Sequence, residues 1–486
     1  MVRRRHLYSF SKSSRLPRVE ALDRRELLAT MPHPVAVISA TTLDSRSVTV
    51  SYEVTSPAPG ASITFGVFRS ASSRFDPGAI PVGLPVAVPA VDASGHPSGA
   101  PGVHLVTLPI AGGLPINPKH PYVLVVADPG SPSASDPGES ASFRKVVLGV
   151  ITHGGLEYDH WKKYGPPWEL EMARSLRDQG YDSVIAYNWV SQSNTPGAAA
   201  KQGPILASRV LDASSRFPSA DPVDIHFIGH SEGAVVNTLA IARVEAAASP
   251  RIRAGYLQDT LLDPHAANPD YPGRQYSVGG PLAWVAKLAI DNYQARARDP
   301  LVSIPRGVDS AQVFYQQTPA DKAHNENLGM YNLWGQVPVK GPADYFNLTS
   351  AGVVHSGKRG VYAWYEHHVV PTLGDGAPAI ARETLTGRLA NPTAPGGDAV
   401  ASSRATYTGK TAPGATVTLL AGGAGPSRLR VVGRGVAGPD GLWAATTGPL
   451  ADGQYRVVAE ARLPAAYPGD RPPVPTAPLG RLAVRG

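Results

Sequence analysis

The chain has 486 residues and no cysteine, which excludes disulfides, thiolate catalysis and cysteine-ligated metal sites. With 42% hydrophobic and 17% charged residues, it has enough apolar material for several packed domains, and global disorder is excluded. No apolar run approaches the roughly 18 residues that a membrane span requires, so none is expected.

The formal net charge of +7 is concentrated at the amino terminus, where residues 1–30 hold eight Lys/Arg against three acids. We interpret residues 1–32 as a basic, disordered leader. A nucleic-acid-binding protein is more often basic on a folded face, so no nucleic-acid partner is expected.

Within this leader, the segment 16–29 resembles the Leu-Glu-x-Arg-x-Leu-Leu type of signature that opens many large exported or surface bacterial proteins. The resemblance implies a secreted or cell-surface location. The alternative is a single amphipathic helical turn within a disordered leader. Arg3–Arg5 is not followed by the apolar core of a cleavable signal peptide.

In residues 33–128, apolar and polar residues alternate along the sequence with a period of two. Along Val48–Val54 apolar side chains alternate with polar ones, and turns rich in Pro and Gly separate such segments with no helical pattern between them. This predicts an immunoglobulin-like β-sandwich. Residues 129–142, rich in Pro, Gly, Ser and Asp, predict a linker.

Short apolar strands then alternate with amphipathic helices over residues 143–383. The predicted segments include strands at Val146–Thr152, Val184–Tyr187, Ile225–Ile228 and Gly255–Leu262, and helices at Trp168–Gln179, Ile205–Leu211 and Ala234–Ala248. Such alternation predicts a mostly parallel sheet with helices on both faces.

Residues 384–486 again show the alternation with a period of two that is typical of β-strands, for example along Tyr455–Ala459. The runs Gly409–Leu419, Asp440–Trp443 and Leu450–Tyr455 resemble bacterial Ig-like domains of cell-surface proteins. The resemblance implies a second β-sandwich, which would space the central domain or contact a cell surface or matrix.

The pattern that bears on chemistry is Gly229-His-Ser-Glu-Gly233, directly after an apolar strand and before a helix. This is the form of a nucleophile elbow, a strained turn that exposes the Ser231 hydroxyl. Gly229 and Gly233 suit a turn where a β-carbon would clash with neighbouring chain. The alternative interpretation is a structural Gly/Ser turn.

In this context the central segment resembles an α/β-hydrolase of the lipase/esterase branches. The resemblance implies that Ser231 is the nucleophile and that the backbone N–H groups of Gly155 and Glu232 form the oxyanion hole. Gly154, in His153-Gly154-Gly155, would allow the close turn, with His153 in a structural role. The Glu232 carboxylate would select against anionic substrates or for cationic ones.

The acid is expected after the strand that follows the elbow helix, where Asp263 stands. The alternative acid is Asp291, at the end of what looks like the next strand. The histidines that follow Asp263 are His265, His324, His355, His367 and His368. His355 is preferred, because it precedes a predicted helix at Val361–Val370 in a loop suited to the base, and His324 is the alternative.

These residues imply a serine hydrolase that cleaves a small-molecule or lipid ester through a Ser-Asp-His triad and an acyl-enzyme, without a cofactor. No His-Glu-x-x-His motif is present, and no metal site is expected. Residues 301–349 are long enough for a cap but lack an apolar lid stripe. Two alternatives remain open: an amidase or peptidase on the same scaffold, and a non-catalytic surface adhesion or binding protein with a hydrolase-like core.

Overall fold

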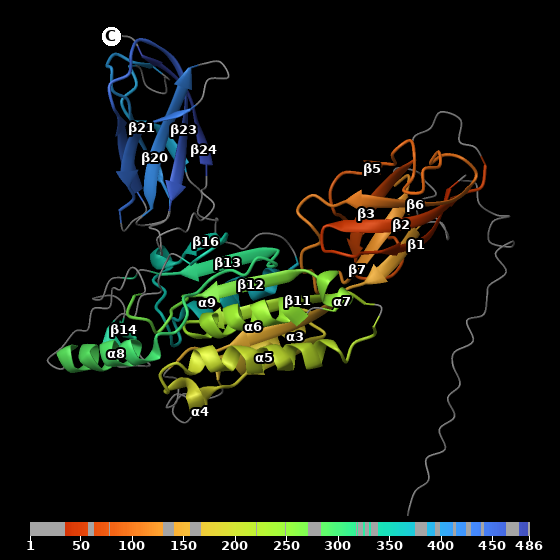
Figure 1. Ribbon diagram of the computed structural model, residues 1–486, viewed down its shortest axis with the longest axis horizontal. Coiled ribbons are helices and arrows are strands. Elements are labelled where there is room, and N and C mark those ends of the chain that lie inside the picture. The colour runs from red at the N-terminus through yellow and green to blue at the C-terminus, as the bar shows by residue number, and fades with distance from the viewer. Residues whose placement is uncertain are drawn as a thin grey trace, which may run out of the picture.

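The computed structural model describes residues 35–56, 63–76, 78–129, 140–155, 167–219, 221–247, 249–270, 283–316, 318, 324–325, 330–331, 339–374, 386–393, 399–411, 415–423, 429–438, 442–462 and 476–484. The leader expected over residues 1–32 and most of the expected linker lie outside them. Figure 1 shows three parts: β-sheets towards the amino terminus, a central sheet with helices, and a further β-sheet towards the carboxyl terminus. This order of β, α/β and β structure is the order that the sequence predicts.

Two antiparallel sheets form the N-terminal part. The first contains β1 (Val35–Thr41), β2 (Ser47–Val54) and β6 (Gly102–Pro109), and the second contains β3 (Thr64–Ser70), β4 (Ile80–Pro81), β5 (Val86–Ala87), β7 (Tyr122–Ala127) and β8 (Ser140–Arg144). Every second residue of β2 is buried, which confirms the predicted period of two. The two sheets share one apolar core. The strand β8 occupies the end of the expected linker, where it pairs with β7. The immunoglobulin-like class stays a prediction.

Six parallel strands form the central sheet, in the order β10-β9-β11-β12-β13-β16. Their bounds are Val146–Thr152 (β9), Ser183–Tyr187 (β10), Val223–His230 (β11), Leu257–Leu262 (β12), Ser310–Tyr315 (β13) and Asp344–Asn347 (β16). Every residue of β9 and β11 is buried, as expected of central strands covered on both faces. Since the strands are parallel, their carboxyl ends meet at one edge, where the predicted elbow follows β11.

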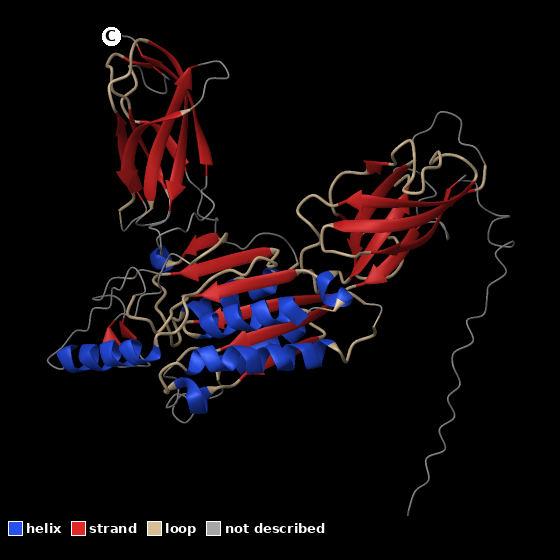
Figure 2. Cartoon of the chain, viewed as in Figure 1, coloured by secondary structure: helices blue, strands red, loops and turns tan. Residues whose placement is uncertain are grey.

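Helices cover both faces of this sheet (Figure 2). The helices α3 (Trp168–Asp178) and α9 (Val361–His368) pack on one face, and α5 (Ala198–Ser214) and α6 (Gly233–Ala247) pack on the other. The shorter elements are α4 (Val190–Ser193), α7 (Pro250–Arg253) and the 3-10 turns Thr349–Ala351 and Val370–Thr372. The predicted parallel sheet with helices on both faces is thus confirmed. Among the described residues, no helix is both long and apolar enough to cross a membrane.

The strand predicted to end at Asp291 is wrong, because Ala283–Ala297 forms a helix, α8. The apolar run Leu288–Ile290 is too short to distinguish a buried strand from a helical turn. Leu288 is largely exposed, so this run does not form a sheet core. Within the segment 301–349 considered as a cap, β13 and β16 belong to the central sheet. Most of residues 317–338 lie outside the described residues, apart from the short pair β14 (His324–Asn325) and β15 (Met330–Tyr331).

One continuous sheet forms the C-terminal part, in the order β17-β19-β22-β21-β20-β23-β24-β18. Its strands are Thr386–Leu389 (β17), Ala399–Val400 (β18), Thr406–Lys410 (β19), Thr416–Gly423 (β20), Arg430–Val436 (β21), Leu442–Thr447 (β22), Gly453–Arg462 (β23) and Thr476–Val484 (β24). The strands β17 and β24 are far apart in this order yet contact each other, so the sheet curls around a core that includes Trp443. The expected sandwich is therefore one curled sheet, and its Ig-like class stays a prediction.

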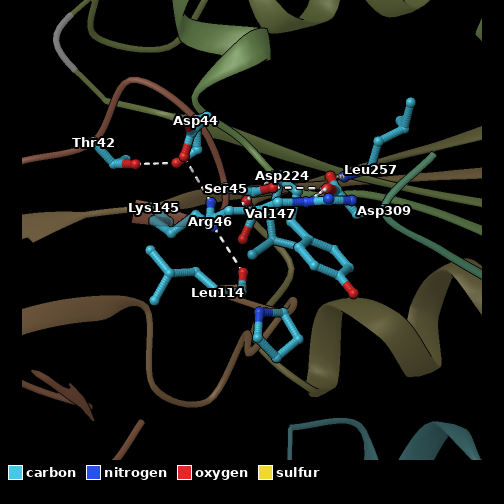
Figure 3. Close-up of polar contacts among 12 residues, drawn as sticks. Thr42, Asp44, Ser45, Arg46, Leu114, Lys145, Val147, Asp224, Leu257 and Asp309 are labelled. Carbon is cyan, nitrogen blue, oxygen red and sulfur yellow. Dashed lines mark hydrogen bonds and ion pairs between the residues drawn. The ribbon is translucent and has the colours of Figure 1, made fainter. Parts of the chain in front are cut away.

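Buried polar contacts join the N-terminal part to the amino ends of the central strands (Figure 3). Lys145 precedes β9 and forms an ion pair of 2.7 Å with Asp224 of β11, and both side chains are fully buried. The Lys145 ammonium also donates a hydrogen bond of 2.9 Å to the backbone carbonyl of Leu114. Ser45 donates a hydrogen bond of 2.8 Å from its hydroxyl to Asp309, which precedes β13. These contacts lie at the edge of the sheet opposite the elbow.

Candidate active site

The strand β11 ends at His230, Ser231 turns the chain, and α6 begins at Gly233. Ser231 has a φ of 54°, in the left-handed region that non-glycine residues rarely adopt. A β-carbon on Gly233 would lie 2.4 Å from the backbone oxygen of Thr152, and one on Gly229 would lie 2.7 Å from the Asn237 side chain. A side chain at either glycine would therefore clash with the chain around this strained turn.

A chain of two hydrogen bonds links the preferred candidates from three separate loops. His355 Nε2 lies 3.1 Å from Ser231 Oγ, and His355 Nδ1 lies 2.7 Å from Asp263 Oδ2. Because a carboxylate only accepts, Nδ1 carries the hydrogen, which leaves the lone pair of Nε2 to accept the Ser231 hydroxyl. Each of the three residues is at most 8% exposed. This is the arrangement in which an acid orients an imidazole and the imidazole withdraws a proton from serine.

Asp263 directly follows β12 and has a φ of 48°. Its backbone N–H donates a 2.7 Å hydrogen bond to the carbonyl of Phe314, in the neighbouring strand β13. Gln316, just after β13, donates to the Asp263 carboxylate from its backbone N–H at 3.3 Å and from its side chain at 3.0 Å. Sequence analysis did not single out Gln316. Its position after the strand next to β12 is the signal that could have identified it, because carboxyl ends of adjacent parallel strands lie together.

The other candidates occupy different places. Asp291 lies in the middle of α8 and is half-buried, whereas Asp263 is the acid that bonds His355. His367 and His368 are exposed at the end of α9. His324 forms part of the two-residue strand β14. The backbone N–H of His265 donates to the Ser231 carbonyl at 3.2 Å, so this residue supports the elbow through its main chain.

The glycine loop after β9 lies against the elbow, as the resemblance implies for an oxyanion hole. A β-carbon on Gly154 would be 2.8 Å from that of Ser231. His153 holds this loop: its Nε2 accepts the backbone N–H of Trp189 at 3.0 Å, and its Nδ1 lies 2.8 Å from the Gly154 carbonyl. The indole of Trp189 donates back to the His153 carbonyl at 2.9 Å, and the two rings stack. These contacts fit the structural role expected for His153.

Glu232 follows Ser231 and is buried, with 4% of the residue exposed. Its carboxyl lies against Gly155, because a β-carbon built on Gly155 would be 1.6 Å from Glu232 Oε2. Burial, and then the charge of Asp299, raise the pKa of Glu232 well above its usual range. The expectation that the Glu232 carboxylate selects among anionic and cationic substrates stays a prediction.

Within the described ranges, no group of three acidic or histidine side chains could hold a metal ion. The site instead consists of a serine, an imidazole, a carboxylate and backbone N–H groups at the carboxyl edge of a parallel sheet. Together they can deliver a nucleophile to an electrophilic carbonyl and stabilise the oxyanion that forms.

No family model matches the sequence, and no curated protein matches it significantly. Among solved structures, the chain is similar to phospholipase PlaB from Legionella pneumophila, at 10% identity over 67% of this chain and 87% of that one, with a TM-score of 0.25. It is also similar to a β-glucosidase from Listeria innocua, at 11% identity over 70% of this chain and 46% of that one, with a TM-score of 0.16. A β-glycosidase from Bacteroides vulgatus matches at 11% identity over 93% of this chain and 65% of that one, with a TM-score of 0.15. Similarities this weak carry no argument about activity, which rests on the geometry of the site.

Proposed function

We propose that the protein is a serine hydrolase with an α/β-hydrolase core that cleaves carboxylic esters. The observation that carries this proposal is the hydrogen-bonded chain from Ser231 through His355 to Asp263. It lies where the α/β-hydrolase fold presents its nucleophile, on a strained turn between a central strand and a helix. The left-handed φ of Ser231 supports the proposal, because such strain clusters at active sites.

In the proposed reaction, His355 takes the proton of Ser231 as the serine oxygen attacks the ester carbonyl. The backbone N–H groups of Gly155 and Glu232 stabilise the oxyanion of the tetrahedral intermediate. His355 then returns the proton to the leaving alcohol, and the acyl group stays on Ser231. A water molecule, deprotonated by His355, attacks this acyl-enzyme and releases the acid. Asp263 remains ionised throughout and stabilises the imidazolium that forms.

We further propose that the flanking β-sheets are immunoglobulin-like spacers of a secreted or cell-surface protein, over residues 33–128 and 384–486. The central domain would then span residues 143–383. The substrate would be a small-molecule or lipid ester that reaches the carboxyl edge of the central sheet, while the N-terminal sheets dock at the opposite edge.

A fluorophosphonate probe tests the nucleophile, because it reacts only with an activated serine. We expect stoichiometric labelling of the wild-type protein, mapped to Ser231 by peptide mass spectrometry, and none in Ser231→Ala. Ser208→Ala is the matched control, because Ser208 is an exposed serine on α5 whose hydroxyl donates to the Pro204 carbonyl. Labelling that survives in Ser231→Ala would overturn the assignment.

Substrate class is tested next with p-nitrophenyl esters of increasing acyl length and with the corresponding anilides. Turnover of esters with slow or absent turnover of anilides supports the esterase proposal. Faster turnover of anilides would instead identify an amidase or peptidase. A wild-type protein that is neither labelled nor active on any ester or anilide would favour the non-catalytic surface-binding alternative.

A further inference from the structure

Glu232 occupies space that a side chain on the oxyanion loop would otherwise fill. The Glu232 Oε2 atom would lie 1.6 Å, and its Cδ 2.7 Å, from a β-carbon on Gly155. A larger residue at position 155 would have to displace this carboxyl. Glu232 thus connects the helix side of the elbow to the loop that the proposed function uses for oxyanion binding.

Tyr293 and Asp299 act on the Glu232 carboxyl. Tyr293, on α8, has its hydroxyl 3.5 Å from Glu232 Oε2 and 3.1 Å from the backbone carbonyl of Ser193. The phenol is the donor to both oxygens, so Glu232 accepts from Tyr293. Asp299 is 1% exposed, and its charge raises the pKa of Glu232.

We propose that Glu232 is a positioning residue: its carboxyl, which lies against Gly155 and accepts from Tyr293, fixes the Gly155 loop so that the backbone N–H of Gly155 meets the oxyanion. This inference rests on the proposed function. It assigns the side chain of Glu232 a role beyond that of its backbone N–H. The side chain does not touch the reacting atoms and acts through the loop.

The arrangement has a consequence at alkaline pH. The titratable groups that act on Glu232 are Asp299, after α8, and Tyr293, on α8. Burial and Asp299 raise the pKa of Glu232, and burial raises the pKa of Asp299 to about 6. As pH increases, ionisation of Glu232 places a second negative charge against Asp299. The repulsion moves the carboxyl from Gly155, and kcat is expected to fall in an alkaline limb.

The experiment measures kcat and KM of the full chain on p-nitrophenyl butyrate from pH 6 to pH 10, with Ser231→Ala as the blank for spontaneous hydrolysis. In Glu232→Ala we expect kcat at pH 7 to fall about tenfold or more with KM little changed, a part of the loss known for removal of an oxyanion donor. Glu232→Gln keeps the shape and cannot ionise, so it should recover part of that loss and lack the alkaline limb. In Asp299→Asn the like charge is gone, and the limb should move to lower pH.

The matched control is Glu245→Gln, another partly buried glutamate on α6, whose carboxyl packs against Gly307 away from Ser231. Its pH profile should follow that of the wild type. An alkaline limb that persists unchanged in Glu232→Gln, or a wild-type kcat in Glu232→Ala, would overturn the positioning role. Fluorophosphonate labelling separates this failure from that of the proposed function: a labelled Ser231 with unchanged profiles refutes only the role of Glu232, whereas an unlabelled wild type refutes the hydrolase.

Discussion

The imidazole of His230 donates a hydrogen bond of 2.9 Å from Nε2–H to the backbone carbonyl of His355. The residue before Ser231 thus holds the loop that carries His355. The His230 ring also packs edge-on against Trp168 and Tyr362, and its centroid lies 4.7 Å from that of His355. Through this pair, the last residue of β11 fixes the distance between Ser231 and His355.

Replacement of His230 should therefore slow the reaction without weakening substrate binding. His230→Phe keeps an aromatic ring but loses a hydrogen bond of about 1 kcal/mol, so we expect kcat to fall about fivefold to tenfold with KM unchanged. His230→Ala loses the ring packing as well and should be slower still. Steady-state kinetics on a p-nitrophenyl ester checks both values. A kcat equal to that of the wild type in His230→Phe would show that packing alone holds His355.

The two aspartates considered for the acid can be separated by isosteric substitution. Asp263→Asn leaves the volume unchanged but removes the acceptor that fixes the His355 tautomer, so kcat should fall about 10³–10⁴-fold. Asp291→Asn, in the middle of α8, should leave kcat within about twofold. Measurement of kcat for both variants decides the assignment. The reverse pattern would make Asp291 the acid.

The buried ion pair between Lys145 and Asp224 should be sensitive to removal of one partner. Lys145→Met leaves Asp224 buried without its counter-charge, which should lower the free energy of unfolding by about 3–5 kcal/mol. The double variant Lys145→Met/Asp224→Leu removes both charges and should recover most of this loss. Urea denaturation of the three proteins provides the measurement. A single variant as stable as the wild type would show that the pair contributes nothing.

The free energy of unfolding should also depend on pH through Lys145, in a direction that its pKa determines. Burial lowers the pKa of Lys145 to about 8, below the value of about 10.4 in an unfolded chain. Between these values the unfolded chain binds a proton that the folded protein has released, so the wild type gains stability as pH rises. The difference in free energy of unfolding between the wild type and Lys145→Met should grow from pH 8 to pH 10. A difference that stays constant over this range would contradict the assignment.

Asp259, on β12, is fully buried, and neither of its carboxyl oxygens has a hydrogen-bond partner among the described residues. Burial raises its pKa to about 8. Folding therefore requires Asp259 to take up a proton at neutral pH, at a cost of about 1.4 kcal/mol for each pH unit above the usual carboxyl pKa. Asp259→Asn cannot ionise and should stabilise the protein more at pH 7 than at pH 5, as thermal unfolding at the two pH values would show. Equal shifts at both pH values would mean that Asp259 is ionised in the folded state.

Local patterns made the strands, the elbow and the parallel sheet predictable. The alternation along β2 and the apolar runs of β9 and β11 are each contained in a short stretch of sequence. The two glycines around Ser231 are a signal of the same local kind. The strand expected before Asp291 failed because three apolar residues fit a helix as well as a strand.

Relationships between distant residues were not predictable in this way. Gln316 hydrogen-bonds Asp263 although the two residues are 53 positions apart in the sequence. His230 hydrogen-bonds His355, which is 125 positions away. Neither partner has a sequence signature of its own, because only the order of strands in the sheet brings them together. The raised pKa of Glu232 likewise depends on its burial and on Asp299, which no pattern around the elbow reveals.

The contact between Lys145 and Leu114 has a consequence for how this protein can change over evolutionary time. The group that accepts from the lysine is a main-chain oxygen, which every amino acid supplies. The side chain at position 114, and many surface residues of the N-terminal sheets, can therefore be substituted while this contact with the central sheet is kept. Neither Lys145 nor Asp224 can change alone, because the other charge would stay buried without its partner. The outer surface of the N-terminal sheets could therefore diverge while the carboxyl edge of the central sheet, with Ser231, is conserved.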